Sequence, residues 1–106
     1  MKTFEELGLV PDLIRAIDEI GYESPMPIQE AVIPYLLGEG NDVIALAQTG
    51  TGKTAAYGLP LLQKIDPSRE GVQAVVLVPS RELALQIEQV FKAMATGFPV
   101  MSCYGG

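Results

Sequence analysis

Eight consecutive residues near the middle of the chain constrain its fold more than any other feature. They are Ala47, Gln48, Thr49, Gly50, Thr51, Gly52, Lys53 and Thr54, and they fit the phosphate-loop pattern with alanine in the first glycine position. Glycines let successive backbone N–H groups point into one concavity, and a helix that starts there adds partial positive charge. The lysine faces the phosphates and the threonine hydroxyl can bind Mg²⁺. The sequence predicts a nucleoside triphosphate site, the alternative being a glycine-rich turn that binds nothing.

The segments that flank this loop predict alternating strands and helices. Apolar runs at residues 43–47, 75–78 and 100–103 predict strands, because strands without polar alternation are buried on both faces in parallel sheets. Apolar residues at helical spacing predict helices at residues 53–62 and 81–95. This order predicts a doubly wound α/β domain with a parallel sheet.

The first part of the chain predicts two more helices. One starts at Pro11, which suits a first helical turn, and ends before Gly21. The other starts at Pro27, can be kinked by Pro34, and ends at Gly38. We therefore expect an N-terminal helical segment at residues 1–40, followed by the α/β part at residues 41–106.

Charge and composition exclude several classes of protein. Residues 1–50 hold nine acidic and two basic residues, so no broad basic surface is available to grip a nucleic-acid backbone. No apolar run is long enough to span a membrane, and no histidine is present for base catalysis or metal binding. The single Cys103 excludes an internal disulfide, which favours a cytoplasmic location.

A second motif lies upstream, around Gln29. A glutamine amide offers one donor and one acceptor, which match the N6–H and N7 of adenine, and Tyr22 could stack on the ring. Pro25 and Pro27 would stiffen the segment. Read alone, this signal is weak, because a glutamine near a helix start is usually solvated.

These residues resemble the DEAD-box RNA helicases, and the bacterial cold-shock type is the most similar. The segment from Gly21 to Gln29 resembles their Q motif, Phe4 matches their isolated upstream aromatic residue, and the phosphate loop resembles their motif I. Residues 79–86 resemble motif Ia, and Gly105 with Gly106 matches the family's glycine doublet. Two departures are Met26, where the family has a small hydroxyl residue, and Ser80, where it has threonine.

The resemblance implies a RecA-like P-loop NTPase domain with a parallel sheet and flanking helices, truncated. Its cofactors would be ATP and Mg²⁺ and its partner RNA. Phe4, Tyr22 and Gln29 would hold adenine, and residues 47–54 the phosphates, with Lys53 and Thr54 in the catalytic role and Thr54 on the metal. The RNA backbone would be touched by Pro79, Ser80, Arg81, Gly105 and Gly106. Without the resemblance, Arg81 reads as a solvated residue at a helix start.

The resemblance also implies that segments are missing. The Asp-Glu-Ala-Asp segment, the Ser-Ala-Thr segment and the second RecA-like domain would all lie beyond residue 106, and hydrolysis needs groups from them. We therefore expect an N-terminal piece of an RNA helicase that cannot hydrolyse ATP alone and that self-associates through an incomplete sheet. Two alternatives are another P-loop enzyme, such as a DNA helicase or a nucleotide kinase, and a non-catalytic RNA-binding scaffold.

Overall fold

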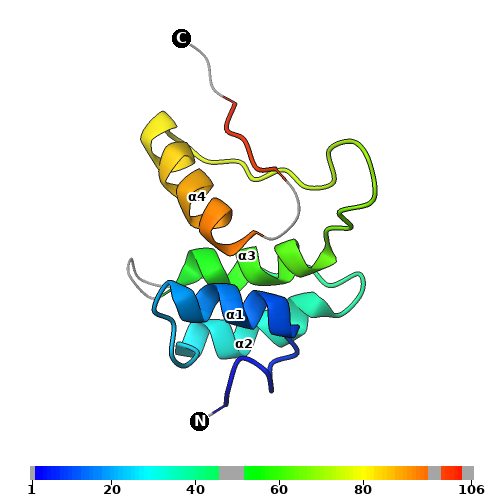
Figure 1. Cartoon of the computed structure of the whole chain (residues 1–106), viewed down its shortest axis with the longest axis vertical. Coiled ribbons are helices and arrows are strands. Elements are labelled where there is room, and N and C mark those ends of the chain that lie inside the picture. Colours follow the sequence, from blue (N-terminus) through cyan, green and yellow to red (C-terminus); the bar gives the residue numbers. More distant parts are fainter. Residues whose placement is uncertain (1, 46–51, 96–98, 104–106) are drawn as a thin grey trace.

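The computed structural model describes residues 2–45, 52–95 and 99–103, and within them the chain forms four helices (Figure 1). The helices are α1 (Pro11–Glu19), α2 (Pro27–Leu37), α3 (Lys53–Lys64) and α4 (Arg81–Met94). All four were predicted from the sequence, with ends within one or two residues. The helical periodicity and the proline and glycine signals are therefore confirmed as guides to this part of the fold.

The four helices begin in different ways. Pro11 and Pro27 occupy the first turns of α1 and α2, where a missing N–H costs nothing. Met26, which stands where the family has a small hydroxyl residue, makes no side-chain capping hydrogen bond at the start of α2. By contrast, the Ser80 hydroxyl at the start of α4 accepts a hydrogen bond from the Leu83 N–H at 3.2 Å, as an N-cap should.

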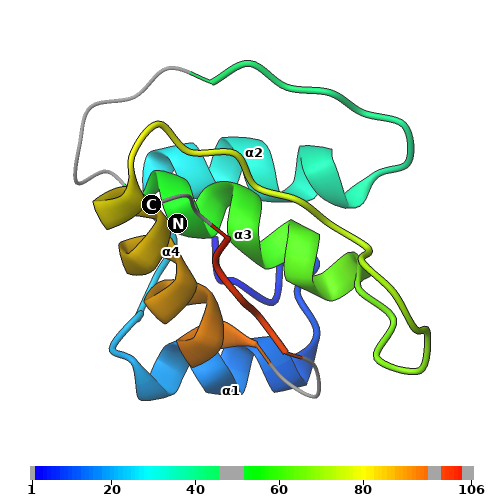
Figure 2. The same cartoon turned by 90° about the horizontal axis from the view of Figure 1, so that it is seen from above.

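Helix α3 lies at the centre of the arrangement. It packs against α2 on one side and against α4 on the other, and α1 also contacts α4. The view from above shows α3 between α2 and α1, with α4 crossing towards α1 (Figure 2). The phosphate-loop residues at the start of α3 therefore belong to a helix that packs against two others.

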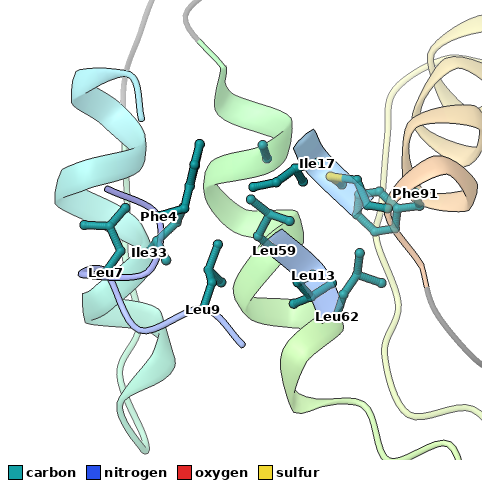
Figure 3. Packing of buried hydrophobic residues seen from close by; sticks show 11 residues of the cluster. Phe4, Leu7, Leu9, Leu13, Ile17, Ile33, Leu59, Leu62 and Phe91 are labelled. Carbon is teal, nitrogen blue, oxygen red and sulfur yellow. The ribbon is translucent and has the colours of Figure 1, made fainter. Parts of the chain in front are cut away.

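One apolar core joins the N-terminal segment to all four helices (Figure 3). Its deepest side chains include Ile17, Ile33, Leu59 and Met94, which are at most 1% exposed. The remaining buried members of the cluster are Phe4, Leu7, Leu9, Leu13, Ala55, Leu62 and Phe91. The core thus draws on residues from both sides of position 40.

The Gln63 side chain fastens the N-terminal segment to α3. Its Oε1 accepts a hydrogen bond from the Val10 N–H at 2.8 Å, and its Nε2 donates to the Gly8 carbonyl at 3.0 Å. Val10 is the N-cap residue of α1 and has no side-chain cap of its own. A distant side chain therefore supplies a partner near the start of α1.

The predicted strands are not formed in the described part of the chain, so the parallel sheet is not confirmed. Residues 43–45, 75–78 and 100–103 carry no strand assignment, and residues 46 and 47 lie outside the described residues. Between described residues, the backbone hydrogen bonds outside the helices are those of turns and helix ends. A strand exists only when a neighbouring strand pairs with its N–H and C=O groups, and no such neighbour is present there.

The segment at residues 75–78 nevertheless keeps the alternation of a strand surface. Val76 is half-buried and packs against the core, whereas Val75 and Leu77 are 73% and 91% exposed. Ile44 and Met101, in the other two predicted strands, are 93% and 81% exposed. Among the described residues, Val76 thus faces the helical core, whereas the side chains of Ile44, Leu77 and Met101 are left uncovered. No helix among the described residues is both long and apolar enough to cross a bilayer.

Candidate nucleotide site

The start of α3 brings together the described part of the phosphate loop. Gly52 is the N-cap residue, and Lys53 and Thr54 form the first turn. The preceding residues of the motif, Ala47, Gln48, Thr49, Gly50 and Thr51, lie outside the described residues. The site can therefore be built from the helix side of the loop.

Gly52 has a backbone conformation that only glycine adopts easily. Its φ of 85° and ψ of 25° lie in the left-handed region, where a Cβ atom is crowded by the backbone. A Cβ at this position would also overlap the Gln29 Nε2 and lie 2.9 Å from the Met26 sulfur. Both the backbone angle and the packing therefore require glycine here.

Gln29 links the start of α2 to the start of α3. Its side-chain Oε1 accepts a hydrogen bond from the Met26 N–H at 2.9 Å, and its Nε2 donates to the Gly52 carbonyl at 3.2 Å. The residue is only 2% exposed, so these two bonds satisfy a polar group that would be costly to bury unpaired. One donor and one acceptor position of the amide remain for another partner.

The sequence identified Gln29 but not this bridging contact to Gly52. A glutamine at the third position of a helix commonly reaches back to the N-cap backbone, so the bond to Met26 could have been anticipated. The bond to Gly52 joins residues 23 positions apart, and no local pattern predicts it.

The Lys53 side chain is placed to attract an anion. It is exposed, and neither a hydrogen bond nor an ion pair engages its ammonium among the described residues. The first turn of α3 contains no acidic residue, so the partial positive charge of the helix N-terminus is not neutralised locally. The site therefore combines the exposed ammonium of Lys53 with the backbone N–H donors of a helix N-terminus, as phosphate sites do.

Thr54 and Tyr57, one turn apart on α3, share a side-chain hydrogen bond. Burial raises the pKa of the Tyr57 phenol above its ordinary value, and the hydrogen bond to Thr54 opposes that rise. Tyr57 was not among the site residues predicted from the sequence. The three-residue spacing from Thr54 on a helix is the signal that could have found it.

The aromatic residues predicted to lie near the base are in contact with each other. The ring centroids of Phe4 and Tyr22 lie 6.4 Å apart, with their planes tilted by 31°. Phe4 is 5% exposed and belongs to the core, whereas Tyr22 is half-buried at its edge. Phe4 therefore packs against the Tyr22 ring from the direction of the core.

The residues present fit a magnesium ion held mainly by phosphate oxygens and water. Among the described residues, no cluster of His, Cys, Asp or Glu could hold a metal ion. The start of α3 instead offers the Thr54 hydroxyl, which is a hard oxygen ligand. Mg²⁺ keeps several waters and takes few protein ligands when substrate phosphates are bound, so this donor set suits it.

The predicted RNA-contacting residues Pro79, Ser80 and Arg81 lie together at the start of α4. Pro79 and Arg81 are exposed, while the Ser80 hydroxyl caps the helix. Gly105 and Gly106 lie outside the described residues. The start of α4 is thus a second exposed helix N-terminus, separate from that of α3.

Two hydrogen bonds hold the segment at residues 99–103 against α4. The Ser102 N–H donates to the Glu88 carboxylate at 2.6 Å, and the Ser102 hydroxyl donates to the Ala84 carbonyl at 3.3 Å. The pKa of Glu88 lies below its usual range, chiefly because the Ser102 side chain and then Lys92 stabilise the carboxylate, with a smaller contribution from the Ser102 N–H. These two hydrogen bonds join residues 14 and 18 positions apart and were not predicted from the sequence.

The chain is similar to known proteins along its whole length. Residues 26–106 match the family described as DEAD/DEAH box helicase. The ATP-dependent RNA helicases DeaD of Haemophilus influenzae and Mycobacterium tuberculosis are 48% and 51% identical to it, each over 98% of this chain. The DEAD-box ATP-dependent RNA helicase CshA of Bacillus cereus is 47% identical over 100% of this chain. This chain spans between 17% and 20% of the length of these relatives.

Solved structures of RecA-like domains share this arrangement of the chain. Dbp5 of Saccharomyces cerevisiae bound to RNA and ADP BeF3 superimposes with a TM-score of 0.87 at 42% identity, over 92% of this chain and 26% of that one. The RNA helicase Prp28 of Chaetomium thermophilum bound to ADP superimposes with a TM-score of 0.88 at 42% identity, over 100% and 27%.

Proposed function

Because the chain belongs to the DEAD/DEAH box helicase family, we propose that it forms the N-terminal part of the first RecA-like domain of an ATP-dependent RNA helicase. Residues 1–40 would then be a helical segment that carries the base-recognition motif, and residues 41–106 the first part of the ATP-binding unit. Two relatives, 48% and 47% identical to this chain, are named for this activity. The family includes enzymes that use ATP to remodel RNA, and in such an enzyme this chain would contribute residues that bind the nucleotide.

The phosphates of ATP would bind at the start of α3. The observation that carries this proposal is the exposed Lys53 ammonium at a helix N-terminus that has no acid in its first turn. Gly52, Lys53 and Thr54 would hold the β- and γ-phosphates together with Ala47, Gln48, Thr49, Gly50 and Thr51. Mg²⁺ would neutralise part of the phosphate charge when bound, with Thr54 as its protein ligand.

Adenine would be read by the bridging residue Gln29. Its amide is held in place by Met26 and Gly52, and the free donor and acceptor positions match the N6–H and N7 of adenine. Tyr22 would stack on the base, with Phe4 behind it. Recognition of the base and the shape of the phosphate loop would then depend on the same side chain.

RNA would bind through the start of α4. Pro79, Ser80 and Arg81 would contact its backbone, together with Gly105 and Gly106. The net charge of −6 argues against a broad electrostatic grip, so a few contacts that follow the shape of the backbone would have to suffice. In the parent protein, a second RecA-like domain would close on this one and supply groups that hydrolysis needs.

Two further parts of the proposal concern the chain in its surroundings. A cytoplasmic location is consistent with the free, exposed Cys103. Copies of this chain would associate through the exposed apolar side chains Ile44, Leu77 and Met101, because unpaired apolar segments invite pairing between chains.

Replacing Lys53 with alanine tests the ATP site. We expect affinity for a non-hydrolysable ATP analogue to fall by at least about 100-fold, since a charge-assisted phosphate grip contributes about 3 kcal/mol. Isothermal titration calorimetry with this chain measures the change. Lys64→Ala is the matched control, because it removes the same charge from the other end of α3, where the ammonium donates to the Gly38 carbonyl.

Unchanged affinity in the Lys53→Ala variant would remove the basis for the proposal. Titration with a GTP analogue adds a separate test of base recognition. Equal affinity for the two nucleotides would leave the phosphate site intact but would contradict the role of Gln29.

A further inference from the structure

Phe4 links the N-terminal segment of the chain to the proposed base site. The centroid of its ring lies 6.4 Å from that of the Tyr22 ring, and the side chain is 5% exposed. Leu7 and Leu9, in the same segment, are buried in the same core cluster. Apolar burial has no direction, so it keeps this segment on the core but does not by itself fix the position of the Phe4 ring.

Hydrogen bonds within residues 3–7 make this part of the segment a single turn. The Thr3 N–H donates to the Glu6 carboxylate at 3.0 Å, and the Glu6 N–H donates to the Thr3 hydroxyl at 3.1 Å. The Leu7 N–H donates to the Thr3 carbonyl at 3.2 Å. Phe4 lies inside this turn, so whatever fixes the turn on the helices also fixes the Phe4 ring.

Gln63, in the last turn of α3, attaches the segment directly after this turn. Its side-chain amide bonds two backbone groups at once, the Gly8 carbonyl at 3.0 Å and the Val10 N–H at 2.8 Å. An amide that donates and accepts at the same time defines a direction as well as a distance. These two bonds therefore supply the orientation that apolar burial lacks.

The other end of the segment has a weaker attachment. The Lys2 N–H donates to the carboxylate of Glu30 at 3.1 Å, and Glu30 directly follows Gln29 on α2. This is a single bond from an exposed residue, whereas Gln63 makes two bonds. Gln63 is therefore the principal polar constraint on the placement of the segment.

We propose that Gln63 is a positioning residue for base recognition: its two hydrogen bonds hold the N-terminal turn where Phe4 packs against Tyr22. Gln63 lies ten residues after Lys53, which is about 15 Å along a helix, so it acts on the nucleotide only through the segment that it holds. The inference rests on the proposed adenine site. It adds a residue from outside the motifs and predicts an effect on binding of the base but not of the phosphates.

The Gln63→Met variant tests this role, because methionine has a similar length and helix propensity but no amide. Calorimetry gives the affinity for a non-hydrolysable ATP analogue, and displacement of that analogue gives the affinity for inorganic tripolyphosphate. The ratio of the two affinities is the contribution of the nucleoside. We expect the ATP analogue to bind about 5-fold more weakly, because loss of the amide makes the correctly placed turn less populated by roughly the worth of one neutral hydrogen bond. The affinity for tripolyphosphate should not change.

Nuclear magnetic resonance reads the position of Phe4 without any ligand. The nuclear Overhauser effect between the Phe4 and Tyr22 rings should weaken in Gln63→Met, because a loosely held turn increases the mean distance between the rings. Gln89→Met is the matched control. It removes an exposed glutamine amide from α4 and should leave the ring contact and both affinities unchanged.

Two further variants separate positioning from a general structural effect. Phe4→Leu removes the ring but keeps an apolar side chain in the core, and it should lower the contribution of the nucleoside. Adding Gln63→Met to it should change nothing more, because Gln63 would act only through Phe4. Gln63→Glu keeps an acceptor for the Val10 N–H and removes the donor to the Gly8 carbonyl, so it should retain part of the contribution that Gln63→Met loses.

Each result decides for or against this role. An unchanged affinity for the ATP analogue, or an unchanged ring contact, in Gln63→Met would overturn the role of Gln63 and leave the proposed function standing. Equal losses for the ATP analogue and tripolyphosphate, or additive losses in the double variant, would also overturn it. If the unaltered chain binds neither the ATP analogue nor tripolyphosphate, the proposed function itself fails.

Discussion

The helical core and the three apolar segments at residues 43–45, 75–78 and 100–103 contain similar side chains in opposite environments. Leu59 on α3 is 0% exposed, whereas Leu77 is 91% exposed. The first is surrounded by α1, α2 and α4 (Figure 3). The second belongs to a segment in which Val76 packs against the core while Val75 and Leu77 are exposed. Hydrophobicity alone therefore does not decide burial in this chain.

The difference shows what each kind of element needs. A helix satisfies most of its backbone hydrogen bonds within itself, so it forms wherever one apolar face finds a core. A strand needs a second strand for every N–H and C=O group, and that partner is usually distant in sequence. Residues 75–78 have the apolar residues of a strand and one packed face, but they lack this partner among the described residues.

The comparison predicts its largest effect for the two leucines. Leu59→Ala should lower the free energy of unfolding by about 2–5 kcal/mol, because it leaves a cavity in a packed core. Leu77→Ala should change it by less than about 0.5 kcal/mol, as expected for an exposed side chain. Urea denaturation followed by circular dichroism measures both.

If Leu77→Ala lowered the free energy of unfolding by several kcal/mol, the segment would be buried in solution and Leu77 would not differ from Leu59. The Leu77→Lys variant tests whether the exposed segment is a contact between copies. If copies associate through this segment, the charged variant should sediment as a smaller species than the unaltered chain. Equal sedimentation coefficients for the two chains would exclude that contact.

Two glycines give a smaller contrast of the same kind. Gly52→Ala should cost about 2–4 kcal/mol, from left-handed backbone strain and from the disturbed hydrogen bond between Gln29 and the Gly52 carbonyl. Gly71 has a similar φ of 91° but open space around it, so Gly71→Ala should cost only the strain, about 1–2 kcal/mol. Chemical denaturation compares them, and equal costs would mean that Gln29 does not hold the loop.

The smallest expected effect concerns Glu88, which fastens residues 99–103 to α4. Because its folded-state pKa lies below the ordinary 4.5, its contribution is present above that pH and is lost as the pH falls through the folded-state value. The protection factor of the Ser102 amide proton, measured by hydrogen exchange in NMR and corrected for the intrinsic exchange rate at each pH, should therefore fall in acid. The effect on global stability should be slight, because Glu88 lies near solvent.

Glu88→Gln should flatten this acid dependence of Ser102 exchange. Asp12→Asn is the matched control, because it removes the exposed ion pair with Arg15, which involves neither Ser102 nor Glu88. An acid dependence that survives in Glu88→Gln would assign it to another group.

The elements that depend on near neighbours could be predicted from local sequence patterns. The four helices, the proline starts of α1 and α2, and the position of the phosphate loop before α3 all follow from residues within about one or two turns of each other. Lys53 and Thr54 were likewise predicted as site residues, because short motifs carry their chemistry in fixed spacing, and Gln29 was predicted from the resemblance.

Contacts between groups that are distant in the sequence could not be predicted and are seen in the folded chain alone. The bridge from Gln29 to Gly52, the support of Tyr57 by Phe91 and the attachment of Ser102 to Glu88 join residues between 14 and 34 positions apart. It also decided that the apolar segments stay unpaired among the described residues. The physical reason is that packing and strand pairing act through space, so their partners are fixed by the path of the whole chain and not by local spacing.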